Sequence, residues 1–233
     1  MNLPQALSVV VYDDLEDLSA AVAQRIAQIG AWALGEHGMF RIALAGGDTP
    51  RRCYELLQGA SIDWKRVEVY FGDERCLPRG DVGRNDRMAY DTLLGHIGVS
   101  PANVHAIQAE RGARIAAQEY AALLREVLPL DLVLLGVGED GHTASLFPAN
   151  PATEQDEIAV PVFNAPKFPP ERVSLGMNTL NAARNKLFLV SGAAKRTALR
   201  QIAQGMALPA GRVAGAEWHI ERSALPDEIL SKD

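Results

Sequence analysis

The sequence predicts an α/β protein in which helices connect the strands of a sheet. Short runs of β-branched and aliphatic residues alternate with longer segments whose apolar residues recur at helical spacing. The run 131–135 is almost entirely apolar, which is typical of a strand in the middle of a sheet that is covered on both faces. The chain has 233 residues, and an average domain has roughly 150. We therefore expect one domain that spans residues 1–233.

Composition and charge exclude several classes of protein. Hydrophobic residues make up 48% of the chain and charged residues 22%, which excludes a disordered, collagen-like or coiled-coil protein. The net charge of −6 offers no excess of cations for a phosphate polymer, so we expect no nucleic-acid partner. We expect neither secretion nor a membrane location, because the sequence has no basic signal start and no apolar stretch of roughly 18 residues. Cys53 and Cys76 are too few for a disulfide framework, which favours a cytoplasmic protein.

The first part of the chain predicts three strands and three helices. The strands have β-rich, apolar compositions and cover residues 8–12, 41–45 and 67–71. Asp13 or Asp14 can cap a first helix, because apolar residues then recur every three or four positions at Leu15, Leu18, Val22, Ile26 and Ile29. Residues 50–57 predict a short helix, and residues 85–95 predict another one after a loop with two glycines.

The second part continues the alternation. Residues 112–128 have one apolar helical face, and the apolar strand 131–135 follows. The further strand candidates are residues 173–175, 186–190 and 217–220. Residues 150–170 are rich in proline and show no clear periodicity, so we expect a long loop around an edge strand at 158–163.

Glycines and charged residues gather directly after four of the predicted strands. These segments are 46–50, 72–75, 136–142 and 191–195. In open α/β sheets, ligands bind in the crevice at the carboxyl ends of the strands. The four segments together therefore predict a binding site at this edge of the sheet.

The first segment has the composition of an anion-binding turn. Gly46 and Gly47 let the backbone approach a ligand, Thr49 can cap the next helix, and Pro50 suits the first helical position. Free N–H groups at such a helix start bind phosphate, and Lys195 can supply a cation from another glycine turn. The alternative is a simple turn between a strand and a helix.

The third segment matches the dinucleotide pattern G-x-G-x-x-G at residues 136–141, but its context argues against a dinucleotide site. Glu139 and Asp140 would place two carboxylates beside a pyrophosphate, and little room remains for a long helix. The same turn places His142 two residues after Asp140. A histidine is a suitable base near neutral pH, and a neighbouring carboxylate fixes its tautomer. The alternative is a structural histidine at the end of a strand.

The second segment adds Asp73, Glu74 and Arg75. Arg75 can clamp a phosphate or carboxylate and Asp73 can bind hydroxyl groups, although a cluster of surface ion pairs is an alternative. We find no spacing typical of a metal site and no G-x-S-x-G motif of a serine hydrolase, so we expect neither.

With these motifs in order, the chain resembles the 6-phosphogluconolactonase family over nearly its whole length. The motifs are 44–50, 72–75 with Asn85 and Met88, 135–148, 172–175 and 191–195. The resemblance implies a three-layer α/β sandwich with a mainly parallel central sheet, related to the glucosamine-6-phosphate deaminase fold. It also implies hydrolysis of 6-phospho-D-glucono-1,5-lactone to 6-phospho-D-gluconate in the pentose phosphate pathway, without a metal, an organic cofactor or an obligate protein partner.

The resemblance also assigns expected roles to site residues. His142 is the expected base, Asp140 its support, and Arg75 a ligand of the phosphate or of the lactone carbonyl. Asp73 and Asn85 are expected to orient sugar hydroxyls. The phosphate is expected on the backbone of Gly47, Asp48 and Thr49, with Lys195 and Arg172, and Gly46 of the same turn is a further expected substrate-binding residue.

Two other functions stay open from the sequence. Deaminases of the related family carry a Glu five residues after the histidine, where this chain has Phe147, and an aromatic residue where it has Arg75. Both differences favour lactone hydrolysis. A sugar-phosphate binder without activity is the second alternative. The chain also departs from the family at Asp48, where serine is usual, and we expect its carboxylate to turn away and cap the helix.

Overall fold

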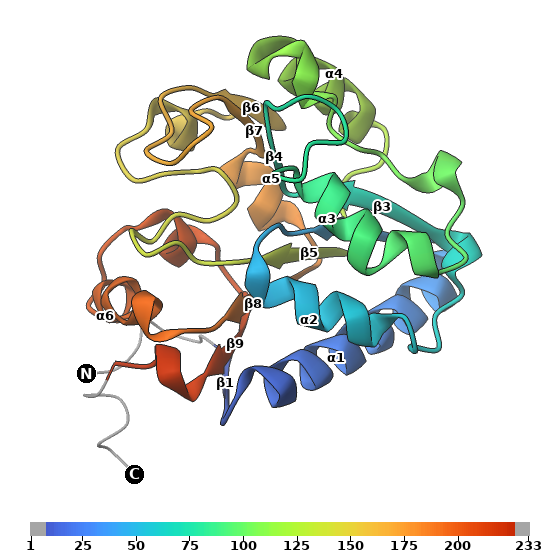
Figure 1. Cartoon of the computed structure of the whole chain (residues 1–233), viewed down its shortest axis with the longest axis horizontal. Helices are drawn as coiled ribbons and strands as arrows, with labels where there is room; N and C mark the ends of the chain where they lie inside the picture. Colours follow the sequence, from blue (N-terminus) through green and yellow to red (C-terminus); the bar gives the residue numbers. More distant parts are fainter. Residues whose placement is uncertain (1–7, 227–233) are drawn as a thin grey trace.

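The computed structural model describes residues 8–226 as three layers (Figure 1). The middle layer is a six-stranded sheet in the order β1-β9-β8-β5-β2-β3, in which all neighbouring strands pair in parallel. Its strands are β1 (Ser8–Tyr12), β2 (Phe40–Leu44), β3 (Val67–Phe71), β5 (Leu132–Leu135), β8 (Asn185–Val190) and β9 (Glu217–Glu221). This sheet confirms the predicted α/β fold, and each of its strands lies within one residue of the predicted range.

A small antiparallel sheet in the order β4-β7-β6 is a feature that the sequence did not predict. Its strands are β4 (Asp73–Arg75), β6 (Ala159–Val162) and β7 (Arg172–Leu175). The sequence indicated no strand at β4, because its three charged residues resemble a loop. Pairing with the buried β7 makes it a strand. The predicted edge strand at 158–163 is confirmed as β6, which contains Pro161 and has one partner strand.

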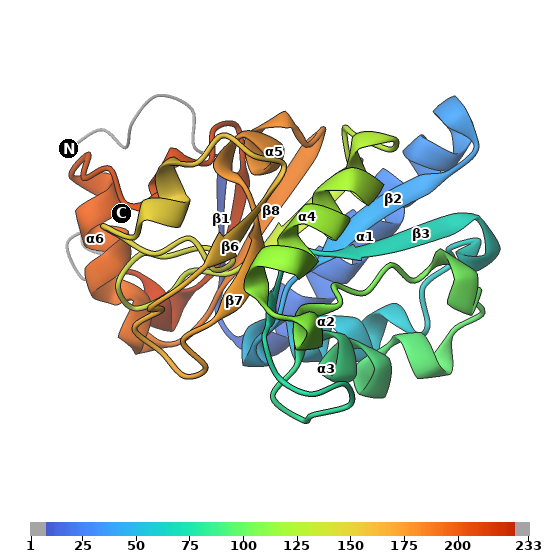
Figure 2. The same ribbon diagram turned by 90° about the horizontal axis from the view of Figure 1, so that it is seen from above.

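The helices cover both faces of the large sheet. They are α1 (Leu15–His37), α2 (Asp48–Leu57), α3 (Asn85–Thr92), α4 (Ala113–Arg125), α5 (Met177–Ala182) and α6 (Arg196–Ala203). Helices α1 and α2 lie on one side, and α4 lies with the small sheet on the other (Figure 2). The predicted starts and ends of the helices differ from the observed ones by up to three residues, and the sequence pattern did not predict the short helices α5 and α6. Within residues 8–226, no helix combines the length and apolar character that a membrane span requires.

The first helix follows the sequence pattern closely. The side chain of Asp14 caps α1 by accepting a hydrogen bond from the backbone N–H of Asp17 at 2.9 Å. Gly38 ends the helix with φ of +78°, a conformation that favours glycine. The apolar stripe predicted on this helix is buried, for example at Leu18 and Ile26. Helix α1 therefore packs against the sheet with the face that the spacing of its apolar residues predicts.

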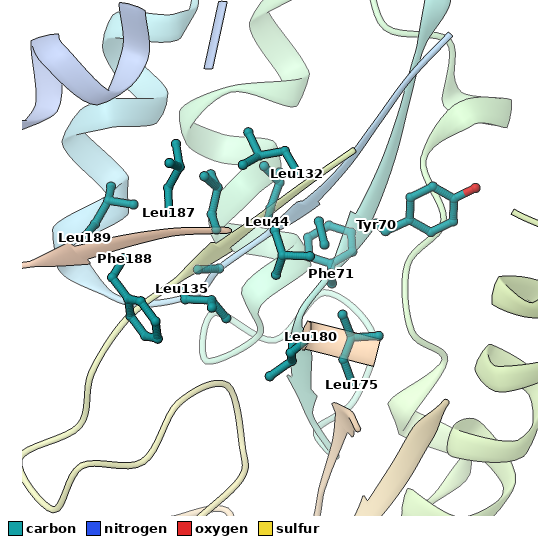
Figure 3. Close-up of a cluster of buried hydrophobic side chains, with 14 of the residues drawn as sticks. Leu44, Tyr70, Phe71, Leu132, Leu135, Leu175, Leu180, Leu187, Phe188 and Leu189 are labelled. Atoms are coloured by element: carbon teal, nitrogen blue, oxygen red, sulfur yellow. The ribbon is translucent and has the colours of Figure 1, made fainter. Parts of the chain in front are cut away.

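The buried hydrophobic side chains of the described residues form one cluster. In Figure 3, Phe71 and Leu135 of the large sheet lie close to Leu175 of β7 and Leu180 of α5. All four residues of β5 are buried, as expected for a strand covered on both faces. This packing joins the small sheet to the large one and fixes the position of β4.

Two tyrosine hydroxyls hold the strand ends that lead into the predicted site. The Tyr54 hydroxyl accepts from the N–H of Ala45 at 2.9 Å and donates to its carbonyl at 2.8 Å. The Tyr120 hydroxyl bonds the N–H and the carbonyl of Phe71 in the same way, at 2.9 and 3.0 Å. Both tyrosines are buried. Each therefore fixes the residue that directly precedes a glycine turn.

Replacing Tyr54 with Phe is expected to lower the free energy of unfolding by about 1–3 kcal/mol, because two buried backbone groups of Ala45 lose their partner. Chemical denaturation followed by circular dichroism measures this change. Tyr90→Phe is the matched control, since Tyr90 is 61% exposed, and should stay within about 0.5 kcal/mol of the wild type. Equal changes in the two variants would contradict the role of the Tyr54 hydroxyl.

Candidate active site

A cavity of about 480 Å³ opens at the carboxyl ends of β2, β3, β5 and β8. The turns after these strands form its walls, as the four glycine-containing segments predicted. The predicted site residues that line it are Gly46, Gly47, Asp48, Thr49, Asp73, Arg75, Asn85, His142, Arg172 and Lys195. Asp140 is the predicted site residue that does not line the cavity. It lies next to His142 instead.

The turn after β2 ends in the start of α2, but its capping differs from the prediction. Gly47 is the residue before the helix, with φ of +103°, and no side chain caps the helix start. Asp48 is the exposed first helical residue, so the expected cap from its carboxylate is wrong. The hydroxyl of Thr49 bonds the Ser191 hydroxyl at 2.7 Å instead of capping, and Pro50 is the third helical residue. The uncapped N–H groups at this helix start therefore remain available to an anion.

His142 and Asp140 form a close pair on the turn after β5. Nδ1 of His142 lies 2.5 Å from Oδ1 of Asp140. Burial raises the pKa of Asp140, but the hydrogen bonds and the charge of His142 outweigh burial and lower it to about 2. Because an ionised carboxylate only accepts hydrogen bonds, we assign the Nδ1 proton to His142. Nε2 of the neutral ring is then the nitrogen that can take up a proton.

The surroundings of this pair leave His142 little freedom. A Cβ atom on Gly138 would lie 1.9 Å from Nδ1 of His142, so only glycine leaves room for the ring there. The ring of Phe147 packs against the imidazole with its centroid 4.4 Å away. The backbone N–H of Gly138 donates to the carbonyl of His142 and closes the turn. No helix follows this turn before Pro151, which agrees with the rejection of a dinucleotide site.

The opposite wall carries Asp73, Asn85 and Arg75. Asp73 accepts hydrogen bonds from the Ser145 hydroxyl at 2.5 Å and from the Asn85 amide at 2.9 Å. These bonds hold the buried Asp73 carboxylate, which forms no close ion pair within residues 8–226, and argue against a surface ion-pair cluster. Nη1 of Arg75 donates to the carbonyl of Gly83, whereas its buried Nε has no hydrogen-bond partner within residues 8–226. Other parts of the Arg75 side chain line the cavity.

Arg172 lies in the wall but already has other contacts. Its guanidinium donates to the carbonyls of Lys167, Phe168 and Pro169. It also stacks over the ring of Phe147 at 5.5 Å. The predicted phosphate ligand therefore also holds one loop of the cavity in place.

Lys195 forms no hydrogen bond or ion pair with the part of the chain that the structure describes. Burial lowers the pKa of its ammonium group, and the positive charge of Lys167 lowers it further, whereas Glu139 and Asp140 raise it. Two lysines that repel each other beside one cavity indicate a place for an anion.

The sequence did not indicate Lys167 and Phe168 as lining residues, and it gave no separate role to Ser191 of the segment 191–195. Lys167 and Phe168 belong to the proline-rich loop that showed no periodicity, and Phe168 is 84% exposed. The only available signal was the position of this loop directly before the Arg-Val-Ser-Leu motif at 172–175. Among residues 8–226, no group of three or more His, Cys, Asp or Glu side chains is arranged to hold a metal ion.

This arrangement suits addition of water to a polarised carbonyl group. It combines a histidine whose carboxylate partner fixes its tautomer with several cations and a helix start that bind anionic groups. The polar groups between them, Asp73 and Asn85, can bind hydroxyl groups. A phosphorylated sugar derivative with a carbonyl group has all three kinds of group that this site suits, namely the carbonyl, an anionic phosphate and hydroxyl groups.

Comparison with known proteins agrees with this chemistry. The chain is 33% identical to a 6-phosphogluconolactonase of Mycobacterium leprae over 238 residues, covering 93% of this chain and 96% of that protein. The crystal structure of 6-phosphogluconolactonase from Thermotoga maritima superposes with a TM-score of 0.87 at 27% identity, covering 93% of this chain and all of that one.

A monomeric glucosamine-6-phosphate deaminase superposes with a TM-score of 0.80 at 22% identity, covering 94% of this chain and 98% of that one. This likeness confirms the expected relation between the two folds. Residues 13–220 match the family model of glucosamine-6-phosphate isomerases and 6-phosphogluconolactonases. This chain is a member of that family.

Proposed function

We propose that the protein hydrolyses 6-phospho-D-glucono-1,5-lactone to 6-phospho-D-gluconate, a step of the oxidative pentose phosphate pathway. The observation that carries the proposal is His142, held by Asp140, in the wall of a cavity that Arg75, Lys167 and Lys195 also line. The matches to 6-phosphogluconolactonases along nearly the whole chain support it.

In the proposed reaction, His142 is the base. Its Nε2 takes a proton from a water molecule whose oxygen attacks the lactone carbonyl. The bond between the carbonyl carbon and the ring oxygen then breaks, and the ring oxygen receives a proton to become a hydroxyl group. Asp140 stabilises the imidazolium that forms in between, since it stays ionised well below neutral pH. The scheme uses no metal ion and no organic cofactor.

The other residues would bind the two ends of the substrate. In this proposal, the phosphate lies on the backbone of Gly46, Gly47, Asp48 and Thr49 at the start of α2, with Lys195 as its cation. Arg75, whose guanidinium lies in the cavity wall, binds the phosphate or the carbonyl oxygen. Asp73 and Asn85 orient the sugar hydroxyls. Arg172 contributes at the phosphate end and supports the loop above it.

The negative charge of Asp48 acts against this phosphate site. Its side chain is exposed at the cavity and forms no capping hydrogen bond. A carboxylate beside a phosphate weakens binding, and exposure to water limits that effect. Relative to a chain with serine at this position, we therefore expect weaker binding of the substrate.

Phe147 separates this proposal from deamination. It stands where the related deaminases carry a glutamate, is buried, and contacts the ring of His142. An apolar ring at this place cannot move protons during ring opening and isomerisation. Lactone hydrolysis needs no acid there.

The proposal also covers partners and location. It takes a small sugar-phosphate lactone as the substrate and requires neither nucleic acid nor a second protein. Cys53 and Cys76 are both free thiols, which suits a reducing compartment such as the cytosol.

Replacing His142 with Ala is expected to lower kcat roughly 10²- to 10⁴-fold with little change in KM, the loss typical of a general base. The assay generates the lactone in situ, follows its disappearance, and subtracts spontaneous hydrolysis. Near wild-type turnover in the variant would place the base elsewhere. If the wild type does not accelerate the reaction, the proposed function fails, and glucosamine 6-phosphate is the next substrate to test.

Replacing Lys195 with Ala is expected to raise KM about 10- to 100-fold and to change kcat much less, because a charge-assisted hydrogen bond to the phosphate is lost. Lys65→Ala removes an exposed lysine that does not line the cavity and serves as the control. Steady-state kinetics of the two variants decide this role. An unchanged KM for Lys195→Ala removes this residue from the phosphate site.

Replacing Gly138 with Ala is expected to lower kcat by at least about 10-fold, because the new Cβ atom displaces the His142 ring from Asp140. Gly98→Ala is the control, since Gly98 is exposed and a Cβ atom there meets nothing within 4 Å. Kinetics and a thermal melt of both variants separate a catalytic effect from a loss of folding. Full activity of Gly138→Ala would show that His142 does not need its present position.

A further inference from the structure

A carboxylate that the proposed reaction does not use is buried directly behind the active site. Along β4, side chains alternate between two sides of the strand. Asp73 and Arg75 line the cavity, whereas Glu74 does not line it and is completely inaccessible to water. Burying a carboxylate is costly unless hydrogen bonds or charges satisfy it. The partners of Glu74 therefore indicate what it does.

The Glu74 carboxylate accepts three backbone hydrogen bonds. Oε1 accepts from the N–H of Asn85 at 2.7 Å and from the N–H of Arg75 at 2.9 Å. Oε2 accepts from the N–H of Asp86 at 2.9 Å. The nearest cation is Arg84, whose Nη2 lies 3.9 Å from Oε2. The carboxylate is thus held mainly by backbone groups, two of which belong to residues of the cavity wall.

Glu74 replaces the missing cap of α3. The residue before this helix is Arg84, and its side chain forms no capping hydrogen bond. The first two N–H groups of the helix, those of Asn85 and Asp86, donate to Glu74 on the neighbouring strand. The start of α3 is consequently tied to β4 through one side chain.

The position of α3 decides where Asn85 points. The Asn85 amide donates to the carboxylate and to the backbone carbonyl of Asp73, both at 2.9 Å. Its Oδ1 fills the space beside Gly46, since a Cβ atom on Gly46 would lie 1.9 Å from it. Asn85 therefore lies between β4 and the glycine turn. A shift of α3 would change both its hydrogen bonds to Asp73 and its packing against Gly46.

We propose that Glu74 is a positioning residue of this active site, which acts on the substrate through Asn85 and Arg75 and does not touch it. The inference rests on the proposed lactone hydrolysis for its activity readout. Glu74 connects β4, which carries Asp73 and Arg75, with α3, which carries Asn85. Its carboxylate fixes the position of the helix start relative to the strand.

The test is Glu74→Gln, which keeps the size of the side chain and turns one acceptor into a donor. We expect kcat/KM to fall about 10- to 100-fold, since misplacement by about 1 Å costs on the order of 10²-fold. Titration calorimetry with 6-phosphogluconate should still give one site per chain, with weaker affinity. A merely structural effect lowers the number of sites and leaves the affinity of the remaining sites unchanged, which would overturn the proposal.

A double-mutant cycle tests whether Glu74 acts through Asn85. In the Asn85→Ala background, Glu74→Gln should lower kcat/KM by a smaller factor than it does in the wild type, because one of the two groups that it positions is gone. Independent, multiplying effects would contradict the proposal. Glu110→Gln is the matched control, because Glu110 also pairs with Arg84 but does not reach Asn85 or Arg75. A loss as large as that of Glu74→Gln would assign the effect to Arg84 and overturn the proposal.

The role of Glu74 can also be tested if the variant does not fold or if the wild type has no lactonase activity. If Glu74→Gln does not fold, Glu74→Asp takes its place, and a loss of kcat/KM at one site per chain supports the proposal whereas full activity overturns it. If the wild type lacks lactonase activity, the proposed function fails, and affinity for 6-phosphogluconate decides the role of Glu74. Binding weakened about 10-fold supports the role, and unchanged binding overturns it.

Discussion

The parallel pairing of β5 with β2 on one side and with β8 on the other is the constraint on which the site depends. Parallel strands end at the same edge, so the turns that follow these three strands open into one cavity. Each turn brings different chemistry. The turn after β2 supplies a helix start, the turn after β5 supplies His142, and the turn after β8 supplies Lys195. The sheet thus joins groups that lie up to about 150 residues apart in the chain.

Polar groups beneath the cavity are satisfied by other parts of the protein. Asp73 has Ser145 and Asn85, Glu74 has three backbone N–H groups, and the end of β2 has the Tyr54 hydroxyl. A neutral buried group would cost about 1–3 kcal/mol if it were left unpaired, and a buried carboxylate would cost more. Nε of Arg75 differs from them, since it is buried and has no hydrogen-bond partner among residues 8–226.

Two glycines in the site are needed because a side chain at either position would collide with a neighbouring site residue. The sequence suggested that Gly46 and Gly47 allow the backbone to approach a ligand, and it gave no such role to Gly138. At Gly46 and Gly138, the structure shows instead that the missing Cβ makes room for Asn85 and for His142, respectively. These two positions tolerate no larger residue unless a functional side chain moves. Gly47 is different, since its φ of +103° is the reason for glycine there.

The sequence alone determined the strands, the long helices and most of the cavity lining. Apolar spacing follows directly from the periods of helices and strands, and glycine-containing turns mark the ends of parallel strands. It did not predict β4, because three charged residues form a strand there only through pairing with β7. It also could not assign the buried role of Glu74, the contact of Thr49 with Ser191, or the place of Lys167. Those depend on residues distant in the chain, and distance in space is set by packing, which no local pattern encodes.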